Sequence, residues 1–194
     1  MIICATMRCG GTIFCIEKAA EIGGHFIGEL SPAYINSLGI FGTKKQENHE
    51  TGYQPVFELD EYVSHIIDLT APDKLYLINN DAISSALQWS TYRIATRNMA
   101  RAQRSMADLV IRANAGVDAE SVFFRIARFC QTQLEGNILI RRYCELTGKP
   151  IIFYEDHYTS KASYPNLDRF PLKDRVEKYF EHLASIDPMT TRGS

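Results

Sequence analysis

Short, continuous apolar runs alternate along the chain with longer segments in which apolar residues recur at helical spacing. Each short run lies between residues that interrupt regular structure. Short apolar runs of this kind are typical of strands buried on both faces of a parallel sheet. Five such strands are predicted, at residues 1–5, 25–28, 74–78, 91–96 and 150–154.

Four segments have the period of a helix. They are residues 12–22, 99–113, 118–148 and 172–183. The first is predicted to be mostly buried and to end at a glycine pair, Gly23 and Gly24. The long third segment begins at a capping residue, Asp118, and ends at Gly148, while Gly136 is a point where it can kink or divide.

The alternation of strands and helices predicts an α/β protein, a three-layer sandwich around a mainly parallel sheet. A length of 194 residues with 45% apolar content suits a single domain. We expect that domain to span residues 1–188 and to be followed by a disordered tail, residues 189–194. Residues 39–52 have no apolar period and predict a mobile loop.

The charge balance argues against binding to a nucleic-acid backbone. The chain has 21 basic and 23 acidic side chains and a net charge of −2, so it lacks the large positive field that such binding needs. It also contains no run of about 18 apolar residues and no secretory signal pattern at its start. We therefore expect a cytoplasmic protein with neither a membrane nor a nucleic-acid partner.

The cysteines occur at irregular spacings, without the CxxC pair that would suggest a zinc site or a redox dithiol. Their number is odd, which argues against a complete disulfide framework. The pattern predicts mostly reduced cysteines in the core of an intracellular protein. They are Cys4, Cys9, Cys15, Cys130 and Cys144.

Residues 6–12, with the sequence TMRCGGT, lie where the first predicted strand meets the first helix. The adjacent glycines Gly10 and Gly11 allow positive backbone angles and close approach of a ligand, and a helix start offers unpaired N–H groups to an anion. Arg8 and the Thr12 hydroxyl can join these groups. The alternative is a tight structural turn, with its arginine on the surface and its cysteine in the core.

This turn differs from two common phosphate loops. It is not a Walker A loop, because no lysine precedes Thr12. It is not a phosphatase-type CxxxxxR loop either, because Cys15 stands six residues after Cys9, where an arginine is needed. Ordinary hydrolysis of ATP or GTP is therefore disfavoured.

A second candidate anion site follows the strand predicted at residues 91–96. Arg97 can offer a planar, permanently charged fork to a phosphate, and Ser105 lies eight residues further on, about two helical turns away. Two anion sites at neighbouring strand ends suggest a ligand that is phosphorylated at two positions. The alternative is that Arg97, Arg101 and Arg104 form a solvated basic face of a helix.

These residues resemble the sulfotransferases that use 3′-phosphoadenosine-5′-phosphosulfate (PAPS), in particular their compact bacterial and phage branch. Residues 7–12 align with the family's 5′-phosphosulfate loop, with Arg8 at the basic position and with Met7, Cys9 and Gly11 where the family has proline, serine and a hydroxyl residue. The family's 3′-phosphate motif is reproduced by Arg97, Asn98 and Ser105. Residues 151–156, IIFYED, resemble the family's late strand.

The resemblance implies a P-loop NTPase-like fold and transfer of a sulfuryl group from PAPS, without a metal, to a hydroxyl of a small acceptor such as a sugar. It implies that the cofactor-binding residues are Arg8, Cys9, Gly10, Gly11, Thr12, Arg97 and Ser105. Arg8 and Thr12 would also stabilise charge during transfer.

The acceptor needs a general base. Glu29 is the main candidate, because it ends the second strand on the same sheet edge as Arg8, and the family places a catalytic glutamate shortly after this strand. His25 has a suitable pKa range but lies at the start of its strand. Residues 31–34 are a further alternative for the position of the base, and Glu29 can instead cap a turn.

Two other functions stay open at this point. The chain can be a nucleotide-binding module that keeps both anion sites without the chemistry, which the altered positions Cys9 and Gly11 favour. It can also be a magnesium-dependent, kinase-like transferase, although the missing Walker lysine argues against that. The acceptor and the oligomeric state do not follow from the sequence.

Overall fold

The structure of this chain is a computed structural model that describes residues 1–29, 71–79, 83–158 and 163–187. The loop predicted at residues 39–52, the alternative base positions 31–34 and the tail at residues 189–194 lie outside the described residues.

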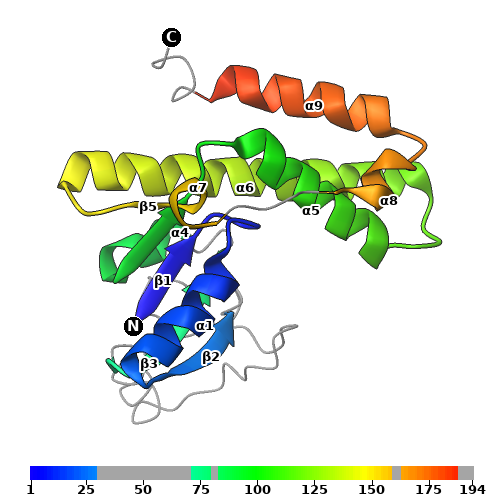
Figure 1. The fold of residues 1–194 in the computed structure, drawn as a ribbon. Coiled ribbons are helices and arrows are strands. Elements are labelled where there is room, and N and C mark those ends of the chain that lie inside the picture. The colour runs from blue at the N-terminus through cyan, green and yellow to red at the C-terminus, as the bar shows by residue number, and fades with distance from the viewer. Residues whose placement is uncertain (30–70, 80–82, 159–162, 188–194) are drawn as a thin grey trace, which may run out of the picture.

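The described part of the chain contains one sheet of five strands, all parallel, as the apolar runs predict (Figure 1). The strands are β1 (Ile2–Ala5), β2 (His25–Glu29), β3 (Lys74–Ile78), β4 (Tyr92–Ala95) and β5 (Ile152–Phe153), in the order β2-β3-β1-β4-β5. The last strand is shorter than the predicted 150–154, because the chain turns at its end into a short helix, α7 (Tyr154–His157).

Successive side chains of β1 enter two different cores, because neighbouring residues of a strand point to opposite faces. Ile3 and Ala5 pack with α1 (Gly11–Ile22). Ile2 and Cys4 pack with α4 (Ile83–Ala86) and α6 (Ala119–Thr147). Helices therefore cover both faces of the sheet, in agreement with the predicted α/β class and consistent with three layers.

The α1 helix begins one residue before the predicted start and ends at Gly23, whose φ of 66° is the left-handed conformation common after helices. It is less buried than predicted. The side chains of Ile13 and Ile16 are 50% and 55% exposed, because only the face with Cys15 and Ala19 packs on the sheet.

The long α6 helix is continuous, so Gly136 does not divide it. This glycine is buried, and a Cβ placed there would lie 3.0 Å from Ile83 Cδ1, so its small size permits the close packing of α4 on α6. The Asp118 side chain accepts a hydrogen bond from the Ser121 N–H and caps the helix, as predicted.

A third core lies between α6 and three other helices, beyond the sheet (Figure 1). These helices are α5 (Met99–Ala113), α8 (Pro165–Asp168) and α9 (Lys173–Ile186). A 3-10 helix, η1 (Leu87–Trp89), completes the described elements. The amphipathic period of α5 predicts its bounds, whereas the short helices have no such period.

The five cysteines are free and buried, which confirms the prediction of reduced core residues. Among the described helices, none combines the length and the apolar character that crossing a membrane requires.

The order of the strands determines where a ligand can bind. From β1 the chain continues to β2 on one side of the sheet, and from β4 it continues to β5 on the other side. The carboxyl ends of these neighbouring strands therefore border a topological switch point, where open α/β sheets hold their ligands.

Candidate functional site

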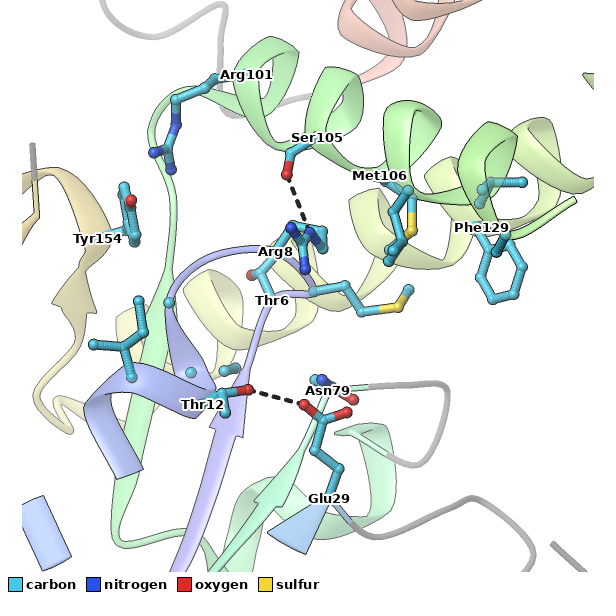
Figure 2. A pocket seen from close by; sticks show the side chains of 18 of the residues that line it. Thr6, Arg8, Thr12, Glu29, Asn79, Arg101, Ser105, Met106, Phe129 and Tyr154 are labelled. Atoms are coloured by element: carbon cyan, nitrogen blue, oxygen red, sulfur yellow. Dashed lines mark hydrogen bonds between the residues drawn. The ribbon is translucent and has the colours of Figure 1, made fainter. Parts of the chain in front are cut away.

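A cavity of about 890 Å³ lies next to this switch point, at the carboxyl ends of β1, β2 and β3 (Figure 2). Its walls come from the β1–α1 loop, the last residue of β2, the residue after β3 and one face of α5. This volume is in the upper part of the range that small-molecule sites occupy.

The β1–α1 loop enters the cavity in a left-handed conformation, with φ of 61° at Arg8 and 73° at Gly10. A Cβ on Gly10 would lie 2.8 Å from the Tyr154 ring, and one on Gly11 would lie 2.8 Å from Ala5 Cβ. Both glycines are therefore required by close packing. No side chain caps the start of α1, so its first N–H groups are suited to an anion in the cavity.

Arg8 meets Ser105 at the cavity wall. Its Nε donates a hydrogen bond of 3.1 Å to Ser105 Oγ, and both residues line the cavity. The two motifs that these residues represent are separated by 97 positions in the sequence. The structure therefore brings together one residue from each predicted anion site.

Thr12 and Glu29 form a second contact at the cavity. The Thr12 hydroxyl donates a hydrogen bond of 2.9 Å to Glu29 Oε1, and both side chains line the cavity (Figure 2). His25 begins β2 at the opposite edge of the sheet and is not among the lining residues. Of the two candidate bases within the described residues, only Glu29 reaches the site.

The charged residues that line the cavity favour an anionic ligand. Among the described lining residues, three guanidinium groups, those of Arg8, Arg101 and Arg125, face one carboxylate, that of Glu29. Arg101 is further held over the Tyr154 ring, at 3.7 Å from the ring centroid.

Arg101 and Arg125 were not predicted as site residues. The sequence contains a signal for Arg101, which precedes Ser105 by four residues and therefore shares its helix face. Arg125 has no comparable signal, because α6 and α5 pack against each other only in the folded protein.

Arg97 does not line the cavity. Its Nη1 and Nη2 donate to the two carboxylate oxygens of Asp156, at 2.6 and 3.1 Å, and its guanidinium stacks on Phe153. The hydrogen bonds from Arg97 hold the pKa of Asp156 below its ordinary value. The predicted pairing of Arg97 with Arg8 around one ligand is thus not seen within the described residues.

The neighbouring carboxylate, that of Glu155, forms hydrogen bonds with the backbone just before α5. It accepts hydrogen bonds from the N–H groups of Arg97 and Asn98, at 3.2 and 3.1 Å, and from the Thr96 hydroxyl. Burial acts to raise the pKa of Glu155, but these hydrogen bonds hold it below its ordinary value. The donors at the start of the second candidate anion site therefore bind a carboxylate of the chain itself.

Cys9, expected to bind the cofactor, does not line the cavity. Its side chain is fully buried and packs with Ala102 and Tyr154. Burial raises the pKa of the thiol to about 12, so it stays protonated at neutral pH. The alternative interpretation of the turn, a tight structural turn with its cysteine in the core, is therefore correct for Cys9.

Two polar residues of α6 hold the strand ends in place. Asn137 is fully buried, accepts hydrogen bonds from the Thr6 hydroxyl and the Thr96 N–H, and donates to the Thr96 carbonyl. Gln133, one turn earlier, donates to the Met7 carbonyl. The sequence signal for this pair is two polar residues four positions apart on an otherwise apolar helix face, because buried polar groups need hydrogen-bond partners.

The described residues contain no group of three or more His, Cys, Asp or Glu side chains that could hold a metal ion. Comparison of the chain with protein-family models, with curated proteins and with solved structures found no match.

Proposed function

We propose that this protein is a PAPS-dependent sulfotransferase that transfers a sulfuryl group to the hydroxyl of a small acceptor. The observation that carries the proposal is the hydrogen bond from Arg8 to Ser105, because it brings one residue from each motif of the family resemblance to one cavity. The contact between Thr12 and Glu29 adds a carboxylate to that cavity.

The phosphosulfate binds at the β1–α1 loop in this proposal. Arg8, the first N–H groups of α1 and the Ser105 hydroxyl supply donors, and within the described residues Arg8 has no carboxylate partner that would compete with the ligand. Because Arg97 does not line the cavity, Arg101 takes its place as the second cationic contact to the nucleotide. A P-loop-like topology, with a phosphate turn after the central strand β1, is part of the same proposal.

The reaction is an in-line displacement at sulfur. A lone pair of the acceptor oxygen forms the new S–O bond, and the bond between sulfur and the bridging oxygen of PAPS breaks. The electron pair of that bond stays on the 5′-phosphate, whose charge Arg8 stabilises. The acceptor proton moves to Glu29, and the products are a sulfate ester and adenosine 3′,5′-bisphosphate.

Thr12 positions the base. Its hydroxyl occupies one carboxylate oxygen of Glu29, which leaves the other oxygen to take the proton. The contact also links the base to the first turn of α1, next to the loop that carries Arg8.

Calorimetry and a transfer assay test this proposal. We expect adenosine 3′,5′-bisphosphate to bind without added metal, and labelled sulfate to pass from PAPS to a member of an acceptor panel. Arg8→Ala should abolish transfer, whereas Arg112→Ala, an exposed residue of α5 outside the cavity, should leave it unchanged.

Other outcomes assign other functions. Binding of the bisphosphate without transfer to any acceptor would favour the inactive nucleotide-binding module. Binding of ATP that depends on magnesium, without binding of the bisphosphate, would favour the kinase-like transferase. Absence of all nucleotide binding would refute the proposal.

A further inference from the structure

The cavity continues along α5 beyond the anion-binding end. Its lining residues run along one face of this helix from Arg101 through Ser105 to Ala113 and end at Asn114, the residue that follows the helix. The distance along the helix axis is about 20 Å. The site is therefore long enough for a second molecule beside a bound phosphosulfate.

The middle of this length is apolar. Met106, Leu109 and Val110 of α5 face the cavity, and Phe129 of α6 completes the wall with a side chain that is 44% exposed. Figure 2 shows Met106 and Phe129 on the side of Arg8 that faces away from Tyr154. A ligand here gains free energy by covering apolar surface, which a sugar with a hydroxyl on nearly every carbon cannot do well.

The far end of the cavity is polar and positively charged. The Asn114 side chain donates a hydrogen bond of 2.7 Å to the Val110 carbonyl. This contact orients the Asn114 Oδ1, which accepts a hydrogen bond from Arg125 Nη1. Within the described residues no carboxylate pairs with Arg125. A guanidinium that is held by a neutral amide can still bind an anionic group of a ligand.

We propose that the acceptor is amphipathic: a hydroxyl at the Arg8 and Glu29 end, an apolar body along α5, and an anionic group at Arg125. This inference rests on the proposed function, and it replaces the sugar expected from the family resemblance with a hydroxylated lipid-like anion. The hydroxyl, the apolar body and the anionic group follow one another along the ligand in the same order as the residues that would contact them along the cavity.

Calorimetry on protein saturated with adenosine 3′,5′-bisphosphate tests the inference with three probes. The probes are ω-hydroxydecanoate, decanediol of the same chain length, and glucose. We expect ω-hydroxydecanoate to bind at least about tenfold more tightly than decanediol, because a charge-assisted hydrogen bond contributes at least that factor. Glucose should bind most weakly.

Matched variants localise the effect. Arg125→Ala should remove the preference for ω-hydroxydecanoate over decanediol, whereas Arg128→Ala, on the same helix but outside the cavity, should keep it. Phe129→Ser should weaken both chain-like probes several-fold, and Phe124→Ser, which is more exposed and does not line the cavity, should weaken neither.

The outcomes separate this inference from the proposed function. If the bisphosphate binds but ω-hydroxydecanoate binds no better than decanediol or glucose, the acceptor class is wrong and the sulfotransferase proposal stands. If Arg125→Ala leaves the preference intact, the anionic group does not lie at Arg125 and the inference is refuted. If the bisphosphate itself does not bind, the proposed function fails and the inference fails with it.

Discussion

Arg97 donates from both Nη atoms to Asp156, and its guanidinium lies 3.8 Å from the centroid of the Phe153 ring. Ser105, whose eight-residue spacing from Arg97 is part of the predicted motif, instead accepts a hydrogen bond from Arg8. The two halves of one sequence motif thus have different partners. Removal of Arg97 and removal of an arginine that lines the cavity should therefore affect nucleotide binding differently.

Arg101→Ala should weaken the binding of adenosine 3′,5′-bisphosphate by at least about tenfold, the effect of losing a charge-assisted hydrogen bond. Arg97→Ala should weaken it by less than about threefold, since Arg97 is paired outside the cavity. Calorimetry on the two variants measures both effects. A larger loss for Arg97→Ala would mean that the ligand displaces Asp156 from that guanidinium.

Glu29→Gln should lower the rate of sulfuryl transfer by about 100-fold or more, because an amide cannot take the acceptor proton. The variant keeps the shape of the side chain and an oxygen that accepts from Thr12, so bisphosphate affinity should change little. His25→Gln is the matched control, since His25 is exposed at the other end of β2. Steady-state rates decide between the two residues, and a loss confined to His25→Gln would exclude Glu29 as the base.

Cys9→Ala should leave ligand binding within about twofold of the wild type, because the thiol is buried away from the cavity. We expect the variant to lose about 1 kcal/mol of folding stability through the small void beside Ala102 and Tyr154. Calorimetry and urea unfolding give the two values. A large loss of affinity without a loss of stability would place the thiol at the ligand.

Asn137→Ala should destabilise the fold by about 2–4 kcal/mol, because it leaves buried groups of Thr6 and Thr96 without their partner. Gln131→Ala, an exposed change on the same helix, should stay within about 0.5 kcal/mol of the wild type. Urea unfolding at neutral pH measures the difference. Equal stabilities for the two variants would contradict the role of Asn137, which is to connect the ends of β1 and β4 through hydrogen bonds to Thr6 and Thr96.

Glu155→Gln should remove a pH-dependent part of the stability. The pKa of Glu155 is lowered in the folded protein from its ordinary value of 4.5, so the carboxylate stabilises the fold above that pH. The difference in unfolding free energy between wild type and variant, about 1 kcal/mol at neutral pH, should shrink as the pH falls below 4.5. A difference that stays constant down to about pH 3 would show that the hydrogen bonds do not depend on the charge.

Much of the fold was predictable because the signals are local. The bounds of β3 (Lys74–Ile78) and α5 (Met99–Ala113) agree with the predicted ones, and Asp118 and Gly148 cap α6 as expected. Apolar period and capping residues act within a few positions of the chain. The turn that carries Arg8 was predictable for the same reason.

The partners of individual side chains were not predictable in this way. Arg97 and Asp156 are 59 positions apart, and the cavity wall formed by Arg125 depends on how α6 lies against α5. The short helices, such as α7, have no period to detect and depend on the packing around them.

The sequence alone determined the α/β class, the parallel strands and the place of the turn between β1 and α1, because periodicity and turn chemistry are properties of neighbouring residues. Only the tertiary structure decided which arginines share the cavity with Arg8. A guanidinium on a helix end can pair with whichever carboxylate or ligand the fold brings to it, and that choice depends on segments far apart in the chain.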